Sequence, residues 1–324
     1  MTPGPVDEFD WIASLRSLTR GDHRALDLRD DVAVLPAKPG FDLVISKDAM
    51  VEGVHFLPCE SPEVIGRRLL RTSLSDLAAK AAEPFGYFLM TAWPRDRDHA
   101  YRQAFASGLE LDGRRFGIAL LGGDTVATTG PLTVSATVMG WVEAGGAVLR
   151  SGARPGDRIV VCGTIGDGTL GLAAARGEVS DPGLVLATRY RLPEPLFFLR
   201  QPLLRFASGA ADVSDGLLAD VGHIASASSL GAEINVARLP LSKEAGRWLT
   251  QQQDQIAGLL RLATGGDDYA VACAVEPAKA AAFMAEVRDQ SIRVADVGEF
   301  VIGAGLRVSM NGVAIRTDSL GWRH

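Results

Sequence analysis

Acidic side chains follow apolar runs of this sequence, or stand beside small and polar residues, at several points. The acids placed in this way are Asp31, Asp48, Asp124, Asp212 and Asp215. An apolar run that stops at a carboxylate predicts a buried strand that carries the acid to its open end. Carboxylates brought together would repel one another unless cations lie among them, and carboxylate oxygens are ligands that Mg²⁺ prefers. The first hypothesis is therefore a site for several metal ions, and the usual ligand of such a site is a polyphosphate.

Length, composition and charge limit the class of protein. A chain of 324 residues favours two domains, and 47 % apolar residues are enough for a full core. The formal net charge of −6 argues against broad electrostatic binding to nucleic acid or to anionic membranes. The negative net charge does not exclude anionic substrates, because bound cations can reverse the local sign of the charge.

Cysteine usage and the N-terminus indicate where the protein resides. The three cysteines contain no Cys-x-x-Cys pair, which argues against a disulfide framework and a structural zinc site. Asp7, Glu8 and Asp10 have the wrong sign for a secretory leader. No apolar run approaches the roughly 18 residues that a membrane span needs. We therefore expect a soluble, cytoplasmic protein.

The first half of the sequence predicts an α+β unit. Helices are expected over 8–18, 61–82 and 98–115, and strands over 41–46, 87–93, 118–121 and 132–143. This order of elements is typical of an α+β or ferredoxin-like unit. A stretch rich in Gly, Pro and polar residues over 145–157 ends the unit, so we predict domains at 1–148 and 149–324.

The second half alternates strands and helices and predicts an α/β domain. Strands are expected over 158–162, 210–213, 232–236, 269–275 and 292–297, and helices over 169–176, 183–190, 195–206, 217–226, 243–249 and 278–289. A short hairpin should turn at Asn311-Gly312.

Two glycine-rich nucleotide motifs can be tested on the sequence alone. Residues 166–171 fit Gly-x-Gly-x-x-Gly, but no strand ending in an acid follows about 20 residues later, as a dinucleotide site requires. The stretch therefore predicts a turn into a helix. The P-loop needs a Gly-Lys pair, and the sequence contains none. If the protein handles ATP, then metals, Arg and backbone N–H groups must hold the phosphates.

Four further candidate site segments each allow a structural interpretation and a functional one. Gly122-Gly123-Asp124 is either a plain turn or a place where backbone N–H groups approach a phosphate. The run 212–216 opens a helix, so its polar side chains serve as caps, and the helix end also favours a phosphate. Asp76 lies inside a predicted helix, where an isolated acid is more often on the surface. A lone His is usually structural, but His55 follows a glycine on the loop after the strand of Asp48, which also allows a polar contact with a substrate.

Taken together, the segments that carry these residues resemble the thiamine-monophosphate kinases. That family belongs to the superfamily that also contains aminoimidazole-ribotide synthetase and selenophosphate synthetase. The resemblance runs in order along nearly the whole chain, over 30–34, 48–56, 73–79, 122–125, 150–157, 212–217 and 265–269. The aspartate segments mark the superfamily, whereas 51–56 and the tail 321–324 point to the thiamine family in particular.

The resemblance implies a fold, a reaction and a set of site residues. The fold would be an N-terminal half-barrel sheet domain that pairs in a homodimer, followed by a C-terminal α/β sandwich. The reaction would be ATP-dependent phosphorylation of thiamine monophosphate to thiamine diphosphate at several Mg²⁺ ions, without a general base. The implied metal ligands are Asp31, Ser46, Asp48, Asp76, Asp124, Asp212 and Asp215; the ATP contacts are Gly123, Asp124, Arg150 and Ser214; the thiamine phosphate contacts are His55, Asp267 and Trp322. Asp48, Asp124 and Asp215 are expected to matter most.

Three positions depart from the pattern of that family, and two rival functions stay open. Arg29 stands where the family has Gly, Lys47 where it has Thr, and Asp267 where it has Glu. The Lys47 ammonium could replace a cation, pair with the acids or contact phosphate directly. One rival is a sister enzyme that uses ATP on another small molecule. The other is a nucleotide- or thiamine-phosphate-binding protein whose chemistry was lost at Arg29 and Lys47.

Overall fold

The chain divides into two compact units. The computed structural model describes residues 8–317 and 319–322, so Asp7 of the acidic N-terminus and the tail residues Arg323 and His324 lie outside the described residues. Unit 1 comprises Met1–Leu77 and Ala82–Gly145, and unit 2 comprises Ala78–Ala81 and Gly146–His324.

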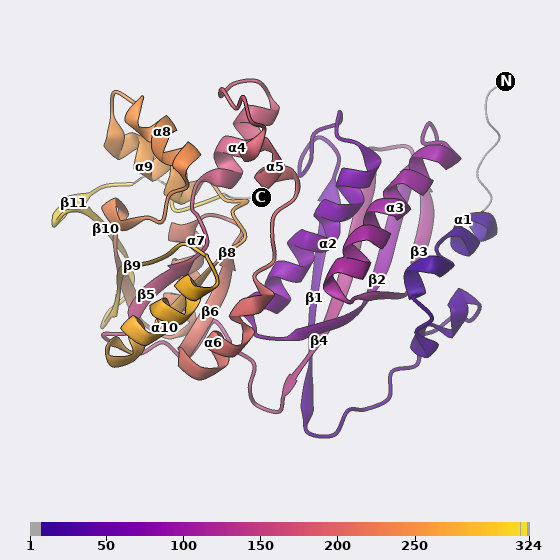
Figure 1. Cartoon of the computed structure of the whole chain (residues 1–324), viewed down its shortest axis with the longest axis horizontal. Helices are drawn as coiled ribbons and strands as arrows, with labels where there is room; N and C mark the ends of the chain where they lie inside the picture. The colour runs from indigo at the N-terminus through magenta and orange to yellow at the C-terminus, as the bar shows by residue number, and fades with distance from the viewer. Residues whose placement is uncertain (1–7, 318, 323–324) are drawn as a thin grey trace. The chain divides into compact units, whose positions relative to one another are not determined.

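Unit 1 contains a four-stranded sheet and two long helices (Figure 1). Its elements follow the predicted order: α1 Glu8–Ser14, β1 Phe41–Val51, α2 Pro62–Ala79, β2 Glu83–Pro94, α3 His99–Phe116, β3 Ala119–Thr128 and β4 Thr133–Glu143. The predicted first helix is shorter than expected, because the chain turns into 3-10 helices η1 Arg16–Thr19 and η2 His23–Leu28. The strand order is β1-β4-β2-β3, with β2 and β3 parallel and the other pairs antiparallel.

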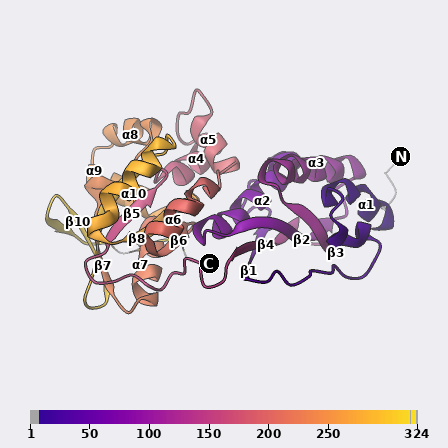
Figure 2. The same ribbon diagram turned by 60° about the horizontal axis from the view of Figure 1, so that its bottom comes forward.

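The two faces of this sheet have different neighbours. α2 and α3 lie on one side of it (Figure 2). Successive side chains of a strand point to opposite faces, so Ser46 and Asp48 face the helices whereas Ile45 and Lys47 face the other side. On that other face, η2 covers part of the sheet through Ala25, which packs with Leu121 and Met139 of the strands. Ile45 and Lys47 are exposed there, and we call this side the open face of the sheet.

β1 and β3 extend further than the sequence predicts. Their apolar runs end at 46 and 121, yet the strands continue to Val51 and Thr128. Asp48 and Asp124 therefore lie inside strands, and the prediction that they stand at open strand ends is wrong. Polar residues can continue a strand because the ladder to β4 and β2 goes on pairing there, as Val51 with Thr133 and Thr128 with Pro94 show.

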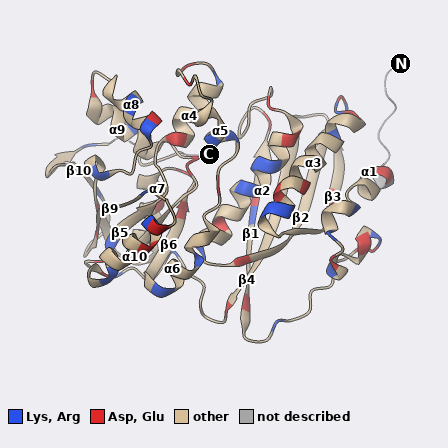
Figure 3. Cartoon of the chain, viewed as in Figure 1, with Lys and Arg blue, Asp and Glu red and all other residues tan. Residues whose placement is uncertain are grey.

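A buried ion pair joins the two helices of unit 1. Nε of Arg71 on α2 lies 2.5 Å from Oδ2 of Asp112 on α3, and Nη2 lies 2.9 Å from Oδ1. Asp112 is 1 % exposed. Figure 3 shows the basic and acidic positions on these two helices. The fork geometry fixes α2 against α3 and compensates two charges that would otherwise be costly to bury.

Unit 2 is a seven-stranded sheet with helices on both faces. Its strands are β5 Arg158–Cys162, β6 Ala207–Val213, β7 Gly231–Asn235, β8 Ala270–Val275, β9 Val294–Val301, β10 Gly305–Met310 and β11 Val313–Ile315, in the order β11-β10-β7-β9-β5-β8-β6. Its helices are α4 Asp167–Ala175, α5 Val185–Arg191, η3 Phe197–Leu199, α6 Arg200–Phe206, α7 Leu217–Ala227, η4 Val236–Arg238, α8 Lys243–Thr250, α9 Gln255–Thr264 and α10 Pro277–Asp289. The sequence prediction omits α9, and the predicted helix over 195–206 is two elements, η3 and α6.

The core of unit 2 has two apolar layers. Successive side chains of β5 point into opposite layers. Val161 packs in one cluster with Ile224 of α7, and Val160 packs in the other with Phe283 of α10. This arrangement is the α/β sandwich expected for the C-terminal part, so the predicted fold class, an α+β N-terminal unit followed by an α/β sandwich, is confirmed. Across the described residues, no helix combines the length and apolar character that crossing a membrane requires.

Candidate functional site

Three predicted metal ligands meet on the helix-covered face of unit 1. Oγ of Ser46 donates a hydrogen bond of 2.5 Å to Oδ2 of Asp76, which joins β1 to α2. Asp76 is only partly exposed and faces β1 rather than solvent. Burial, and then the charge of Asp76, raise the pKa of Asp48 to about 6, against the lowering effect of a hydrogen bond from Ser73. A cation beside Asp48 would offset both of the effects that raise its pKa.

The opposite face of the same sheet carries a cavity of about 350 Å³. Asp31, Gly123 and Asp124 line it, together with Asp30 and Lys47. Much of the remaining lining is apolar, from Ile12, Leu15, Leu28, Phe88, Met90 and Leu120. The predicted metal ligands of unit 1 thus form two groups, one on each face of the sheet.

Gly122 and Gly123 allow β3 to pack against β2. A Cβ on Gly123 would overlap the carbonyl oxygen of Leu89, and one on Gly122 would lie 2.8 Å from the ring of Phe88. Because both glycines lie inside β3, the reading of this stretch as a plain turn is wrong. Asp124, the next residue, is exposed and accepts the backbone N–H of Thr125 at 2.9 Å.

His55 lies half-buried in the turn after β1. Its Nδ1 accepts the backbone N–H of Val51 at 3.1 Å, so that ring nitrogen is used by the turn itself. A substrate contact would have to come from Nε2 on the other edge of the ring. The substrate role of His55 stays a prediction.

In unit 2, residues 212–216 form the turn between β6 and α7. Asp212 is 5 % exposed near the end of β6. The cap position of α7 is Gly216, without a side-chain hydrogen bond. Instead, Oδ2 of Asp220 in the first turn of α7 accepts the backbone N–H groups of Ser214 and Asp215, each at 3.1 Å. The cap predicted from Ser214 or Asp215 is therefore wrong, and Asp220 fixes the turn.

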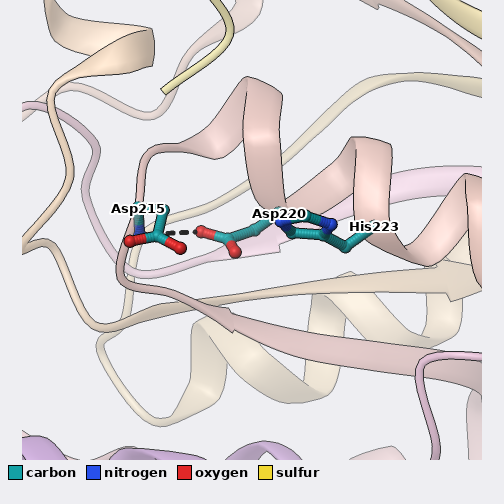
Figure 4. A group of neighbouring side chains, drawn as sticks. All are labelled: Asp215, Asp220 and His223. Atoms are coloured by element: carbon teal, nitrogen blue, oxygen red, sulfur yellow. Dashed lines mark hydrogen bonds between the residues drawn. The ribbon is translucent and has the colours of Figure 1, made fainter. Parts of the chain in front are cut away.

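Asp215, Asp220 and His223 form a cluster whose last two members sequence reasoning missed. One ligand atom of each lies within 4.8 Å of the others, as Figure 4 illustrates. Asp220 is 1 % exposed, and its Oδ1 has no hydrogen-bond partner among the described residues. Burial, and then the charge of Asp215, raise the pKa of Asp220 to about 7, although the charge of the exposed Arg150 acts to lower it. The signal that could have found them is the spacing of Asp220 and His223, which places them on one helix face.

The predicted substrate residues of unit 2 are joined by backbone hydrogen bonds to the same turn. The N–H of Asp267 donates to the carbonyl oxygen of Ser214 at 2.8 Å, and the N–H of Trp322 donates to that of Asp215 at 2.8 Å. The carboxylate of Asp267 accepts the hydroxyl of Tyr269 at 3.0 Å. The Trp322 side chain is 60 % exposed. Predicted ATP, metal and substrate residues are therefore adjacent within unit 2.

The glycine-rich turn before α4 is occupied by a side chain of the protein. Oδ2 and Oδ1 of Asp268 accept the backbone N–H groups of Gly166 and Gly168, each at 2.8 Å. Burial raises the pKa of Asp268 well above its usual range, although these two bonds lower it. The predicted turn into a helix over 166–171 is confirmed, and its N–H groups bind Asp268.

The acid clusters fit a hard divalent cation. Asp48 and Asp76 stand beside the hydroxyl of Ser46, and all three offer oxygen ligands. In unit 2, the buried Oδ1 of Asp220 lacks a partner among the described residues and lies near Asp215. In both places burial, and then the charge of a neighbouring carboxylate, raise the pKa of an aspartate, and a bound Mg²⁺ would offset both effects.

Comparison with known proteins identifies two family domains along the chain. The family model for AIR synthase related protein, N-terminal domain, matches residues 29–142. The model for AIR synthase related protein, C-terminal domain, matches residues 154–311.

Individual relatives identify the family more specifically than the two domain models do. Thiamine-monophosphate kinase of Caulobacter vibrioides is 56 % identical over 321 residues, which cover 99 % of this chain and 91 % of that protein. The crystal structure of thiamine-monophosphate kinase from Stenotrophomonas maltophilia K279a is 32 % identical with a TM-score of 0.82, over 96 % of this chain and 99 % of that one. The structure of AaThiL complexed with AMPPCP and TMP is 25 % identical with a TM-score of 0.75, over 95 % and 96 %. The chain belongs to the thiamine-monophosphate kinase family of AIR synthase related proteins.

Proposed function

We propose that this chain transfers the γ-phosphate of ATP to thiamine monophosphate and so forms thiamine diphosphate. The observation that carries the proposal is the 56 % identity with a thiamine-monophosphate kinase over 99 % of the chain. A relative solved with AMPPCP and TMP gives further support, since that protein holds two ligands at once.

The acceptor supplies its own nucleophile. A phosphate monoester has a second pKa of about 6, so it is largely a dianion at neutral pH. One of its oxygens forms a bond to the γ-phosphorus while the bond from that phosphorus to the β,γ-bridging oxygen breaks, and ADP leaves with the bonding electrons. No proton has to move in this step, so no general base is required. The task of the chain is to hold two polyanions in line.

Repulsion between the two phosphate groups is the main obstacle. Two unit charges about 4 Å apart cost about 4 kcal/mol at an effective dielectric constant of about 20, and several such pairs must coexist. Bound Mg²⁺ ions would cancel this charge and orient the phosphates. The residues proposed to hold them are Asp31, Ser46, Asp48, Asp76 and Asp124 of unit 1 and Asp212 and Asp215 of unit 2.

The remaining site residues are proposed to bind the two substrates. Gly123, Asp124, Arg150 and Ser214 would contact ATP, and His55, Asp267 and Trp322 would contact thiamine phosphate. The backbone hydrogen bonds from Asp267 and Trp322 to the turn 214–215 support this assignment, because they bring two residues proposed to contact thiamine phosphate next to Ser214, which is proposed to contact ATP. Asp220 would orient the same turn through its two N–H contacts.

We also propose that two copies of the chain pair through the open face of the unit 1 sheet. Leu43, Ile45 and Val126 are 40 %, 56 % and 43 % exposed on that face, and β1 is an edge strand. Exposed apolar side chains beside an unpaired strand edge are the features that a second copy would cover. A cytoplasmic location stays a prediction from the cysteine usage.

Incubation of the protein with thiamine monophosphate, γ-labelled ATP and Mg²⁺ tests the proposed reaction. We expect the label in the terminal phosphate of thiamine diphosphate, with one ADP formed for each product molecule. ADP formation that depends on a different small-molecule acceptor would identify a sister enzyme. Binding of both ligands in a calorimeter without ADP release would identify a binding protein. Either result would overturn the proposal.

A further inference from the structure

Lys47 places a positive charge in the wall of the cavity of unit 1. It stands on β1 opposite Thr137 of β4, and both residues line the cavity. Asp30, Asp31 and Asp124 line the same space. Among the described residues that line the cavity, Lys47 carries the one basic side chain. The cavity therefore combines one ammonium with three carboxylates.

The ammonium of Lys47 does not pair with these acids. No hydrogen bond and no ion pair within 4.0 Å engages it in the part of the chain that the structure describes. Asp124 lies on β3, which is separated from β1 by β4 and β2. Three strand spacings put the Cα atoms of Lys47 and Asp124 about 14 Å apart across the sheet. The ammonium and the acids therefore border a common space of about 350 Å³ without neutralising one another.

This distribution of charge matches a ligand that is anionic near Lys47 and cation-bridged near the acids. A nucleoside triphosphate has that character. Its phosphate oxygens can accept hydrogen bonds from an ammonium directly, whereas they bind beside carboxylates only through a cation. An ammonium also supplies three N–H donors on a flexible stem.

We propose that Lys47 binds a phosphate group of the nucleotide in this cavity and so supplies one of the positive charges from the chain itself. The identity of the anion rests on the proposed function, and the inference extends that function by naming a phosphate contact. It follows that the protein should bind ATP with a weaker requirement for Mg²⁺ than a protein without this ammonium.

ATP binding without turnover tests the inference. Calorimetry would measure the ATP dissociation constant at Mg²⁺ concentrations that start from none, at two salt concentrations, for wild type, Lys47→Met and Lys47→Arg. Lys279→Met is the control, because Lys279 lies on the surface of unit 2 and pairs with Glu276. We expect Lys47→Met to weaken binding by about 10- to 100-fold at low Mg²⁺ and to reduce its salt dependence. Lys47→Arg should retain most of the affinity, and Lys279→Met should match wild type.

An ATP affinity of Lys47→Met equal to wild type at every Mg²⁺ concentration would overturn the inference. Loss of folding is not expected, since Lys47 has no ionic partner among the described residues, and circular dichroism would check this point. If wild type forms thiamine diphosphate while Lys47→Met binds ATP normally, the inference fails and the proposed function stands. If ATP binding depends on Lys47 but no thiamine diphosphate forms, the proposed function fails and the phosphate contact stands.

Discussion

The backbone N–H of Trp322 donates a hydrogen bond to the carbonyl oxygen of Asp215, at 2.8 Å. This bond attaches the C-terminal tail to the turn that opens α7. Gly321 permits the approach, because a Cβ there would lie 2.5 Å from the same oxygen. A predicted substrate residue and a predicted metal ligand are therefore coupled through the main chain.

Two substitutions of Trp322 should separate the side chain from the backbone bond. Trp322→Ala keeps the N–H and removes the indole, so we expect KM for thiamine monophosphate to rise about tenfold or more with KM for ATP unchanged. Trp322→Pro also removes the N–H, so it should disturb the turn and raise the Mg²⁺ concentration needed for half-maximal rate. Steady-state kinetics would measure both effects. Identical kinetic constants for the two variants would show that the bond to Asp215 has no role.

The buried carboxyl of Asp220 predicts a pH dependence of stability in metal-free protein. Its pKa rises from 3.8 to about 7 on folding. Between these values the unfolded chain has already lost the proton that the folded chain keeps, so the free energy of unfolding should fall as pH rises from about 4 to 7. Asp220→Asn cannot titrate and should lose this dependence, with the difference growing by at most about 1.4 kcal/mol per pH unit. Denaturant unfolding in a chelator would measure it, and parallel pH profiles for the two proteins would contradict it.

The Arg71–Asp112 pair should be important for the stability of unit 1. Asp112→Ala removes the buried carboxylate that pairs with the guanidinium of Arg71, so we expect the free energy of unfolding to fall by about 3–5 kcal/mol. Asp289→Ala removes an exposed acid at the end of α10 and serves as the control. Denaturant titration followed by circular dichroism would compare them. Equal stabilities would mean that the pair is not buried in solution.

The proposed homodimer predicts a mutation that separates the copies. Ile45→Lys puts a charge on the open face of the unit 1 sheet and should shift the protein from dimer to monomer. Ile302→Lys is the matched control, because Ile302 is 83 % exposed in unit 2. Light scattering after size-exclusion chromatography would give both masses. A wild-type protein of monomer mass, or a dimer that survives Ile45→Lys, would contradict the proposed interface.

Local signals in the sequence were sufficient for most elements. The predicted order of helices and strands in unit 1 and the hairpin at Asn311-Gly312 are confirmed, since apolar periodicity and turn residues act over a few positions. α9 was missed although Asp254 caps it by accepting the N–H groups of Ile256 and Ala257. Reading that acid as a helix start would have found the helix.

The candidate site was harder to predict because it depends on faces and on distant contacts. The sequence selects Asp48 and Asp124 by residue type, but their faces depend on strands that continue past the acids. The sequence does not identify Asp220, because the two N–H groups that its carboxylate accepts come from a turn that folds back onto it. Asp268 likewise gains its partners, Gly166 and Gly168, from a segment about a hundred residues away.

The metal dependence of turnover tests the central claim that carboxylates of this chain hold Mg²⁺ for phosphate transfer. The measurement is the initial rate of thiamine diphosphate formation against Mg²⁺ concentration for wild type, Asp48→Asn and Asp124→Asn, with Asp289→Asn as the exposed control. We expect each of the first two substitutions to lower the rate at least roughly 100-fold, because each removes a charged ligand, while thermal unfolding changes little. Asp289→Asn should match wild type. Near-normal rates for both Asp48→Asn and Asp124→Asn would contradict the account.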